Sequence, residues 1–176
     1  MSCIKVNTAK PLVCLDNAAG IIECWIANAE DVTSFTVSGT SSKVTAINMA
    51  GATGSTVFYN YQFKKGTGDL STSAAITGAN GTVGYTGTLK LKFFLNSQEN
   101  FDQLDSLVKN ELYIVTRDVN EKYWLLGEKQ KVSVSALNAG WGQNITDFNG
   151  QDIEFTFTEK YQPRELASSS VITAVS

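Results

Sequence analysis

The sequence predicts a mainly β protein, a sandwich or barrel of roughly eight to ten strands with one amphipathic helix at its side. Short segments that alternate apolar and polar residues recur along the chain, separated by turns rich in Gly, Ser, Thr and Asn. Only one segment, about residues 97–110, spaces its apolar residues as a helix does. The chain is 43% hydrophobic and 18% charged, so it can bury a sizeable core.

The first part of the chain predicts an arm followed by three strands. Residues 1–20 form the arm, because Lys10-Pro11 favours extended backbone and residues 16–20 have the composition of a turn. The strand expected at 21–27 is apolar on both faces, which favours a central position in a sheet. Shorter strands are expected at 33–37 and 44–49.

The segment from Thr56 to Leu95 predicts a long ribbon with a hairpin over residues 64–84. Two alternating strands, 56–64 and 82–95, flank a Gly/Ser/Thr-rich segment that contains a possible polar strand, and Asn80-Gly81 is a strong turn signal. Because this ribbon buries little apolar surface, we expect it to pair with a neighbouring copy of the chain. The residues expected on one face are Val57, Tyr59, Tyr61 and Phe63 in the first strand, and Val83, Tyr85, Leu89, Leu91, Phe93 and Leu95 in the second.

The helix expected next has one apolar face and a capped start. Asn96 or Ser97 can cap it, and Glu99 stands where it would complete a capping box with Asn96. Asn110 is a plausible stop. The apolar face consists of Phe101, Leu104, Leu107 and Val108.

Four further strands follow the helix. Residues 112–117 and 122–126 are expected to form a hairpin, and residues 131–137 alternate small apolar and polar side chains. In the closing strand, Ile153, Phe155 and Phe157 face one way. The chain therefore divides into an N-terminal arm (1–20), a β domain (21–160) and a C-terminal extension (161–176). The extension has few apolar residues, so we expect it to become ordered only on assembly.

Composition and charge disfavour several classes of function. The chain has no His, which removes the commonest general acid/base and metal ligand. Its net charge is −3 and it has no dense basic cluster, so tight nucleic-acid binding is not expected, although a surface along which DNA slides is compatible. Three cysteines, Cys3, Cys14 and Cys24, are read as thiols rather than a disulfide framework. Unpaired thiols fit synthesis in the cytoplasm. No secretory signal or membrane span is expected.

The motifs that resemble functional sites have simpler structural explanations. The loop at 147–152 resembles part of a calcium loop, but its glycine has the wrong spacing, and a turn is expected. The glycine-rich segments 66–68 and 78–84 lack the Gly-Lys-Ser/Thr ending of a phosphate loop. Asp102 and Asp105 fit a solvated helix face better than a catalytic pair. We therefore expect no catalytic, cofactor-binding or metal-binding residues, no cofactor, and no enzyme activity.

The aromatic residues leave two alternatives open. Trp25, Trp124 and Trp141, together with several tyrosines, can form core and subunit contacts or can line a sugar-binding surface. Trp141 lies between two glycines and is the most exposed candidate for a ligand platform.

The C-terminal half resembles a known family of structural proteins. The strand and return at 112–128, which include Lys122-Tyr-Trp-Leu-Leu-Gly127, precede a small-residue strand. The loop Asp147-Phe-Asn-Gly150 and the closing strand 153–159 follow. This order is similar to that of tail tube (major tail) proteins of tailed bacteriophages, especially those of phages and prophages of Bacteroidetes-type hosts, over about residues 85–160.

The resemblance implies a virion protein of tail-tube fold: a β-sandwich or barrel subunit with a flanking helix. Six copies of such a subunit usually form a ring, and rings stack into a hollow tube that conducts DNA. The implied partners are copies of the same chain, other phage tail proteins and DNA in passage, without a membrane. The implied location is the phage tail, after synthesis in the host cytoplasm. A connector, tail terminator or baseplate subunit, the tube protein of a contractile secretion system, and a carbohydrate-binding or adhesin module remain alternatives.

Overall fold

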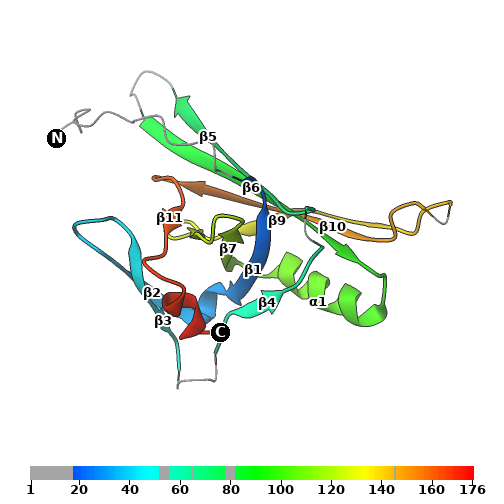
Figure 1. Ribbon diagram of the computed structural model, residues 1–176, viewed down its shortest axis with the longest axis horizontal. Helices are drawn as coiled ribbons and strands as arrows, with labels where there is room; N and C mark the ends of the chain where they lie inside the picture. Colours follow the sequence, from blue (N-terminus) through cyan, green and yellow to red (C-terminus); the bar gives the residue numbers. More distant parts are fainter. Residues whose placement is uncertain (1–17, 52–55, 65, 78–81, 145) are drawn as a thin grey trace.

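The protein is mainly β. The computed structural model describes residues 18–51, 56–64, 66–77, 82–144 and 146–176 (Figure 1). The predicted arm at 1–17, with Cys3 and Cys14, and the turn at Asn80-Gly81 lie outside these residues. The described elements are β1 (Ile21–Asn28), a 3-10 turn (Ala29–Asp31), β2 (Val32–Val37), β3 (Val44–Met49), β4 (Tyr59–Tyr61), β5 (Asp69–Thr77), β6 (Thr82–Phe94), α1 (Gln98–Lys109), β7 (Leu112–Asp118), β8 (Tyr123–Leu126), β9 (Ser133–Gly140), β10 (Gly150–Glu159), β11 (Arg164–Glu165) and α2 (Ser170–Thr173).

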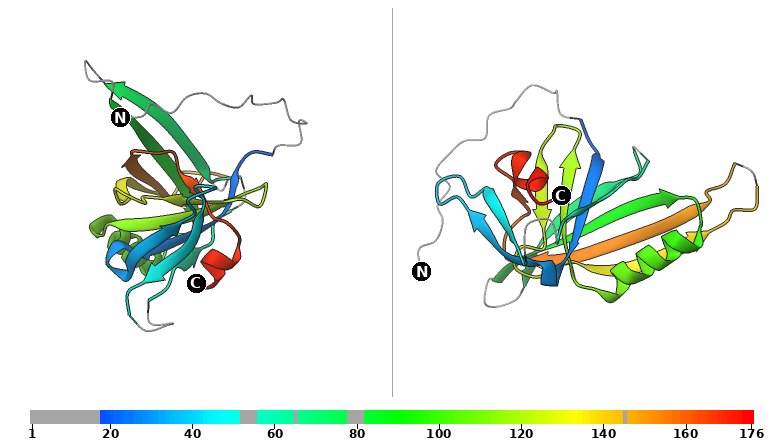
Figure 2. Two further views of the ribbon diagram at one scale, coloured as in Figure 1. Left: turned by 90° about the vertical axis from the view of Figure 1, so that its left-hand side faces the viewer. Right: turned by 90° about the horizontal axis from the view of Figure 1, so that it is seen from below.

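The described strands form three antiparallel sheets. A five-stranded sheet, which we call the central sheet, has the order β11-β8-β7-β1-β4. A four-stranded sheet, which we call the long sheet, has the order β5-β6-β10-β9. β2 and β3 form a separate hairpin. The long sheet crosses one face of the central sheet, and the β2–β3 hairpin and the C-terminal segment lie toward the other (Figures 1 and 2).

The central sheet separates two hydrophobic cores. The first core lies between the central sheet, the long sheet and α1, and it includes Cys24, Ile26 and Phe155. The second core lies between the central sheet, the β2–β3 hairpin and the C-terminal segment, and it includes Trp25 and Val44. Because both faces of the central sheet are covered, β1 is apolar on both sides, and its predicted central position between β7 and β4 is confirmed.

The predicted strands of the C-terminal half are confirmed. β7 and β8 form the expected hairpin, and β10 pairs with β6 over its whole length. The side chains of Ile153, Phe155 and Phe157 are all at most 3% exposed and face the first core. The alternation of apolar and polar residues therefore placed the correct face of β10 inward.

The predicted helix is also confirmed, with one of its two predicted caps. Ser97 accepts a hydrogen bond from the backbone N–H of Asn100, so Ser97 is the N-cap, and Asn110 is the C-cap. The box between Asn96 and Glu99 does not form, because the Asn96 amide instead donates to the Gly140 carbonyl (2.9 Å) and to Asn149 Oδ1 (2.8 Å). These two bonds tie the start of α1 to the end of β9 and to the loop between β9 and β10.

The expectation for residues 56–64 is wrong in two respects. Only residues 59–61 form a strand, β4, and β4 pairs with β1 in the central sheet rather than with the ribbon. The prediction that only one face of this segment is covered is also wrong. Phe58 is 1% exposed in the second core, whereas Tyr61 and Phe63 pack against the first. The segment therefore sends side chains into both cores, while Tyr59, Asn60 and Gln62 stay exposed. The strand that pairs with β6 is β5, the polar segment between the two expected strands.

The expectation that the C-terminal extension orders only on assembly is also wrong. β11 pairs with β8, and Leu166 and Ile172 are each 2% exposed in the second core. Backbone hydrogen bonds run from the Ala167 N–H to the Val44 carbonyl (2.8 Å) and from the Phe58 N–H to the Val175 carbonyl (2.7 Å). The segment has few apolar side chains, but nearly all of them reach a core that the β2–β3 hairpin covers only in part.

Candidate functional site

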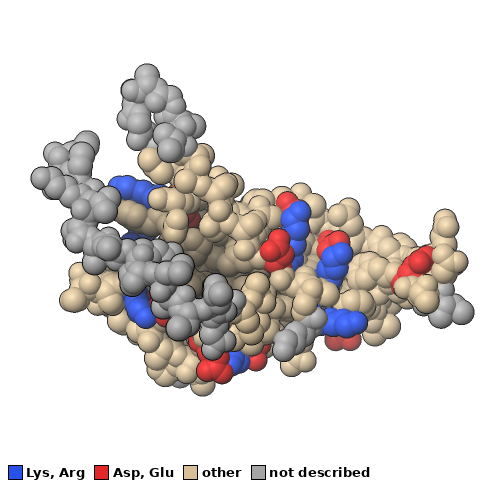
Figure 3. Space-filling view, turned by 45° about the horizontal axis from the view of Figure 1, so that its top comes forward, with Lys and Arg blue, Asp and Glu red and all other residues tan. Residues whose placement is uncertain are grey.

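The outer face of the long sheet is polar, and its two lysines on β6 are paired with carboxylates of β10. Lys90 Nζ lies 2.9 Å from Glu154 Oε2, and Lys92 Nζ lies 3.6 Å from Asp152 Oδ2. Each pair joins residues that are direct partners in the register between β6 and β10. The hydrogen bond from Lys90 to Glu154 raises the pKa of the Lys90 ammonium. Figure 3 shows blue and red side chains next to each other on this part of the surface.

The other outward residues of the same sheet are mostly small and polar. On β6 they include Thr86 and Thr88, and their partners across the sheet are Thr158 and Thr156 of β10. Ser135 of β9 donates to the Glu154 carbonyl at 3.1 Å. The face is therefore hydrophilic without a net excess of either charge among the paired residues.

The long sheet ends in two edges that no described strand covers. β5 is nine residues long and borders only β6, and β9 is eight residues long and borders only β10. Residues 71–75 of β5 are exposed. The β5–β6 hairpin extends beyond the rest of the fold (Figures 1 and 2). The predicted ribbon therefore exists, with β5 rather than 56–64 as its second strand, and none of the described strands pairs with its outer edge.

Aromatic residues cluster at the other end of the long sheet. Trp141 is 65% exposed and stacks on Phe101 of α1, with ring centroids 6.1 Å apart. Phe94 of β6 meets Phe148 edge-on at 5.3 Å, and Lys92 lies 5.4 Å from the centre of the Phe148 ring. Trp141 is thus exposed, as the sequence suggested, with an aromatic ring stacked against it.

The structure does not bring the three tryptophans together. Trp25 is buried in the second core against Tyr123, with ring centroids 5.8 Å apart. Trp124 is half-buried, and its indole N–H donates to Asp118 Oδ2 at 3.1 Å. Trp25 and Trp124 are therefore structural residues, and neither shares a surface with Trp141.

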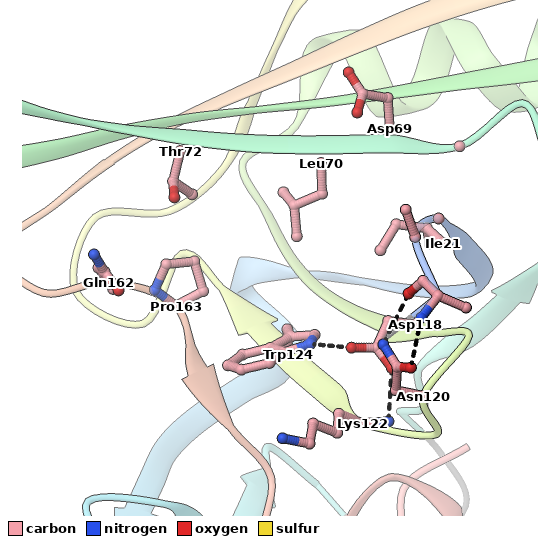
Figure 4. Close-up of a pocket in the computed structure, with 14 residues that line it drawn as sticks. Ile21, Asp69, Leu70, Thr72, Asp118, Asn120, Lys122, Trp124, Gln162 and Pro163 are labelled. Atoms are coloured by element: carbon pink, nitrogen blue, oxygen red, sulfur yellow. Dashed lines mark hydrogen bonds between the residues drawn. The ribbon is translucent and has the colours of Figure 1, made fainter. Parts of the chain in front are cut away.

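A cleft of about 570 Å³ lies between β5 and the turn that joins β7 to β8. Leu70 and Thr72 point into it from β5, whereas Asp69 points away (Figure 4). The Asp118 carboxylate accepts from Trp124 and from the Lys122 backbone N–H, and Asn120 bonds to Ala18. The Asp118 and Asn120 side chains therefore hold the turn and the start of β1 in place.

The motifs that resemble functional sites form ordinary structural contacts. The Asp147 carboxylate accepts from the backbone N–H groups of Asn144 and Gln143, which lowers the pKa of Asp147 and closes a turn. Asp105 pairs with Lys109, and Asp102 accepts from Gln98, on an exposed helix face. Within the described ranges, no group of three or more His, Cys, Asp or Glu side chains is arranged to hold a metal ion.

Two features of the long sheet did not emerge from the sequence. The first is the pairing of Lys90 and Lys92 with the acids of β10. Its only signal in the sequence is that each strand has charges of one sign at every second position. The second is Glu159, which is 5% exposed and accepts from the backbone N–H groups of Lys129 and Gln130.

Neither helix in the described ranges has the length and apolar character needed to span a bilayer. Comparisons of the chain with protein-family models, curated proteins and solved structures found no match.

Proposed function

We propose that this chain is a structural subunit that assembles with copies of itself into rings, as tail tube proteins of bacteriophages do. The observation that carries the proposal is the long sheet with its two open edges, β5 and β9. An exposed edge presents unpaired N–H and C=O groups, and a strand from another molecule can satisfy them.

In this proposal the β5 edge of one subunit lies beside the β9 edge of the next. The two edges are similar in length, nine and eight residues, so each can pair with most of the free backbone N–H and C=O groups of the other. An interface that joins two different surfaces of the same chain closes into a ring when its rotation permits. Sheet continuity around the ring then removes both open edges.

The outer face of the long sheet suits the wall of a DNA channel. A wall with unpaired lysines would bind phosphates and release their counterions, which would hold the DNA in place. Here each of Lys90 and Lys92 lies beside a carboxylate, and the surrounding residues are mostly Ser and Thr. DNA therefore meets a hydrophilic surface that gives it little electrostatic attraction.

The decisive test is negative-stain electron microscopy of the concentrated protein, which is expected to show rings or tubes. The edge variant Thr72→Lys/Ala74→Lys adds two charges to β5 and is expected to stay folded but unassembled, because edge lysines oppose strand pairing. The control variant Thr86→Lys/Thr156→Lys adds the same charge to the central strands β6 and β10 and is expected to assemble. Isolated particles of the unmodified protein at every concentration would contradict the proposal.

The nearest alternatives are other assembling parts of a phage tail, such as a connector or baseplate subunit, and the tube protein of a contractile secretion system. Each of these alternatives is compatible with pairing through the same open edges, so the geometry of the rings in the images is the feature that distinguishes them. Rings that stack into tubes support a tube subunit, whereas single rings that do not stack support a connector or terminator.

A further inference from the structure

A groove of about 600 Å³ runs between β4, the end of β6 and α1, away from the outer face of the long sheet. It lies where the central sheet ends, because β4 is the last strand on that side. Its walls combine aromatic rings with carboxamide side chains. The lining residues are Tyr59, Asn60, Tyr61, Gln62, Phe93, Phe94, Asn100, Gln103 and Leu104.

One aromatic ring in this groove is packed in place, and two others are exposed. Tyr61 packs edge-on against Phe93, with ring centroids 6.1 Å apart, so its orientation is fixed. Tyr59 is 59% exposed and Phe94 is 44% exposed, which is high for large rings. Burial, with smaller effects of Cys24 and Tyr59, raises the pKa of the Tyr61 phenol, so this hydroxyl stays protonated. The groove thus offers ring faces and phenol groups together.

The carboxamides supply unused hydrogen-bonding groups. The Asn100 amide donates to the Leu95 carbonyl at 2.9 Å, which fixes its position at the start of α1. The side chains of Asn60, Gln62 and Gln103 form no hydrogen bond with any residue that the structure describes. A carboxamide both donates and accepts, and so does a sugar hydroxyl. The lining therefore matches a ligand that is rich in hydroxyl groups.

The charge of the groove excludes an anionic ligand. None of its lining residues is charged, although Lys64 Nζ lies 5.3 Å from the centre of the Phe94 ring. Phosphates, nucleic acids and acidic peptides need several cations for tight binding. A purely apolar ligand would leave the carboxamides without partners, which is unfavourable.

We propose that the groove between β4 and α1 binds a neutral saccharide. The rings of Tyr59 and Phe94 pack against the C–H face of a sugar residue, while Asn60, Gln62 and Gln103 bond to its hydroxyls. None of the residues that line this site belongs to β5 or β9, the two edges through which the subunit is proposed to assemble. Trp141, which the sequence singled out, is not among the residues that line the groove.

The test is an array of neutral oligosaccharides (glucans, galactans, mannans and N-acetylglucosamine oligomers) together with sialylated and uronic-acid glycans. The full chain is expected to bind at least one neutral glycan. Tyr59→Ala, which removes a stacking ring, and Gln103→Ala, which removes a hydrogen-bonding group, are each expected to weaken that binding about fivefold or more, because each lost contact is worth about 1 kcal/mol. Tyr59→Phe, which keeps the ring, is expected to retain most of the binding.

The matched control is Trp141→Ala, which removes another exposed ring outside the groove and is expected to leave binding unchanged. The proposal is overturned if no neutral glycan binds, if only charged glycans bind, or if Trp141→Ala alone abolishes binding. A photo-reactive group at Tyr59 that captures a second copy of the chain also overturns it, in favour of a subunit contact. The array measures glycan binding, whereas electron microscopy measures assembly. Failure of one proposal is therefore distinguishable from failure of the other.

Discussion

The ring of Phe157 on β10 lies directly over the backbone of Gly87 on β6. The two residues are partners in the register of the long sheet, and a Cβ atom at position 87 would lie 2.1 Å from Cζ of the ring. Gly87 therefore has no side chain for a packing reason. The ring occupies the space on the inner face of the sheet and closes that part of the first core.

Substitution of Gly87 should destabilise the fold. Gly87→Ala is expected to lower the free energy of unfolding by about 1–3 kcal/mol, the range found for overpacked cores. The control is Gly84→Ala in the same strand, where a Cβ would meet nothing within 4 Å. That variant should be neutral or slightly stabilising, because it restricts the unfolded chain. Urea titration of both variants measures the difference, and equal stabilities would show that the Phe157 ring can move aside without cost.

The docked C-terminal segment should contribute to stability in the isolated chain. Leu166 is 2% exposed and forms a parallel bridge with Val44, so Leu166→Ala is expected to cost about 2–5 kcal/mol. Ala174→Ser, at an exposed position in the same segment, should change stability by less than about 0.5 kcal/mol. Chemical denaturation of dilute, unassembled protein measures both. An unchanged midpoint for Leu166→Ala would mean that the segment is not docked in the single chain.

Glu159 should make stability depend on pH. Burial raises the pKa of its carboxyl above the ordinary value of 4.5, although hydrogen bonds from Lys129 and Gln130 oppose this. The folded state therefore holds this proton more tightly than the unfolded chain, and stability falls as pH rises through the range above 4.5. Glu159→Gln keeps the acceptor oxygen but does not titrate, so its stability should not decrease in this way as the pH rises. Unfolding curves of both proteins between pH 4 and pH 8 give the difference, with Glu30→Gln as an exposed control.

The paired charges on the long sheet should prevent DNA binding. Asp152→Asn/Glu154→Gln leaves Lys90 and Lys92 without partners, and double-stranded DNA should then be retarded in a gel-shift assay. Two new phosphate contacts predict a slope of about −2 in a plot of log affinity against log salt concentration. The unmodified protein and the variant Glu99→Gln/Asp102→Asn, which loses two exposed charges on α1, should show no retardation. Retardation by the unmodified protein would contradict a non-binding channel wall.

Local patterns in the sequence predicted the elements that one stretch of chain determines. The helix at 98–109 follows from the spacing of Leu104 and Leu107, which are both buried, and from the cap at Ser97. The inward face of β10 follows from the alternation of Phe155 and Phe157 with polar neighbours. Each of these features depends on which residues are neighbours in sequence, and a periodic pattern records that information.

Features that depend on distant segments could not be predicted in this way. Phe58 has the same local pattern as a solvent-facing residue, and it is buried only because the C-terminal segment and the β2–β3 hairpin meet there. The ion pair between Lys90 and Glu154 depends on the register of two strands about 60 residues apart in sequence. The groove beside Tyr59 likewise needs three separate elements, so no single motif could indicate it.

Cys24 and Trp25 are adjacent in β1 but face different cores, and this gives the protein two natural reporters of unfolding. Cys24 is 0% exposed in the first core, and burial raises the pKa of its thiol, so a thiol reagent reaches it only when that core opens. Trp25 lies in the second core, where its fluorescence responds to the loss of packing around it. In a chain with Cys3, Cys14, Trp124 and Trp141 replaced, the rate of thiol labelling reports the opening of the first core, and the change in fluorescence reports the opening of the second. If the two signals change together, the two cores unfold cooperatively; if they change separately, the cores unfold independently.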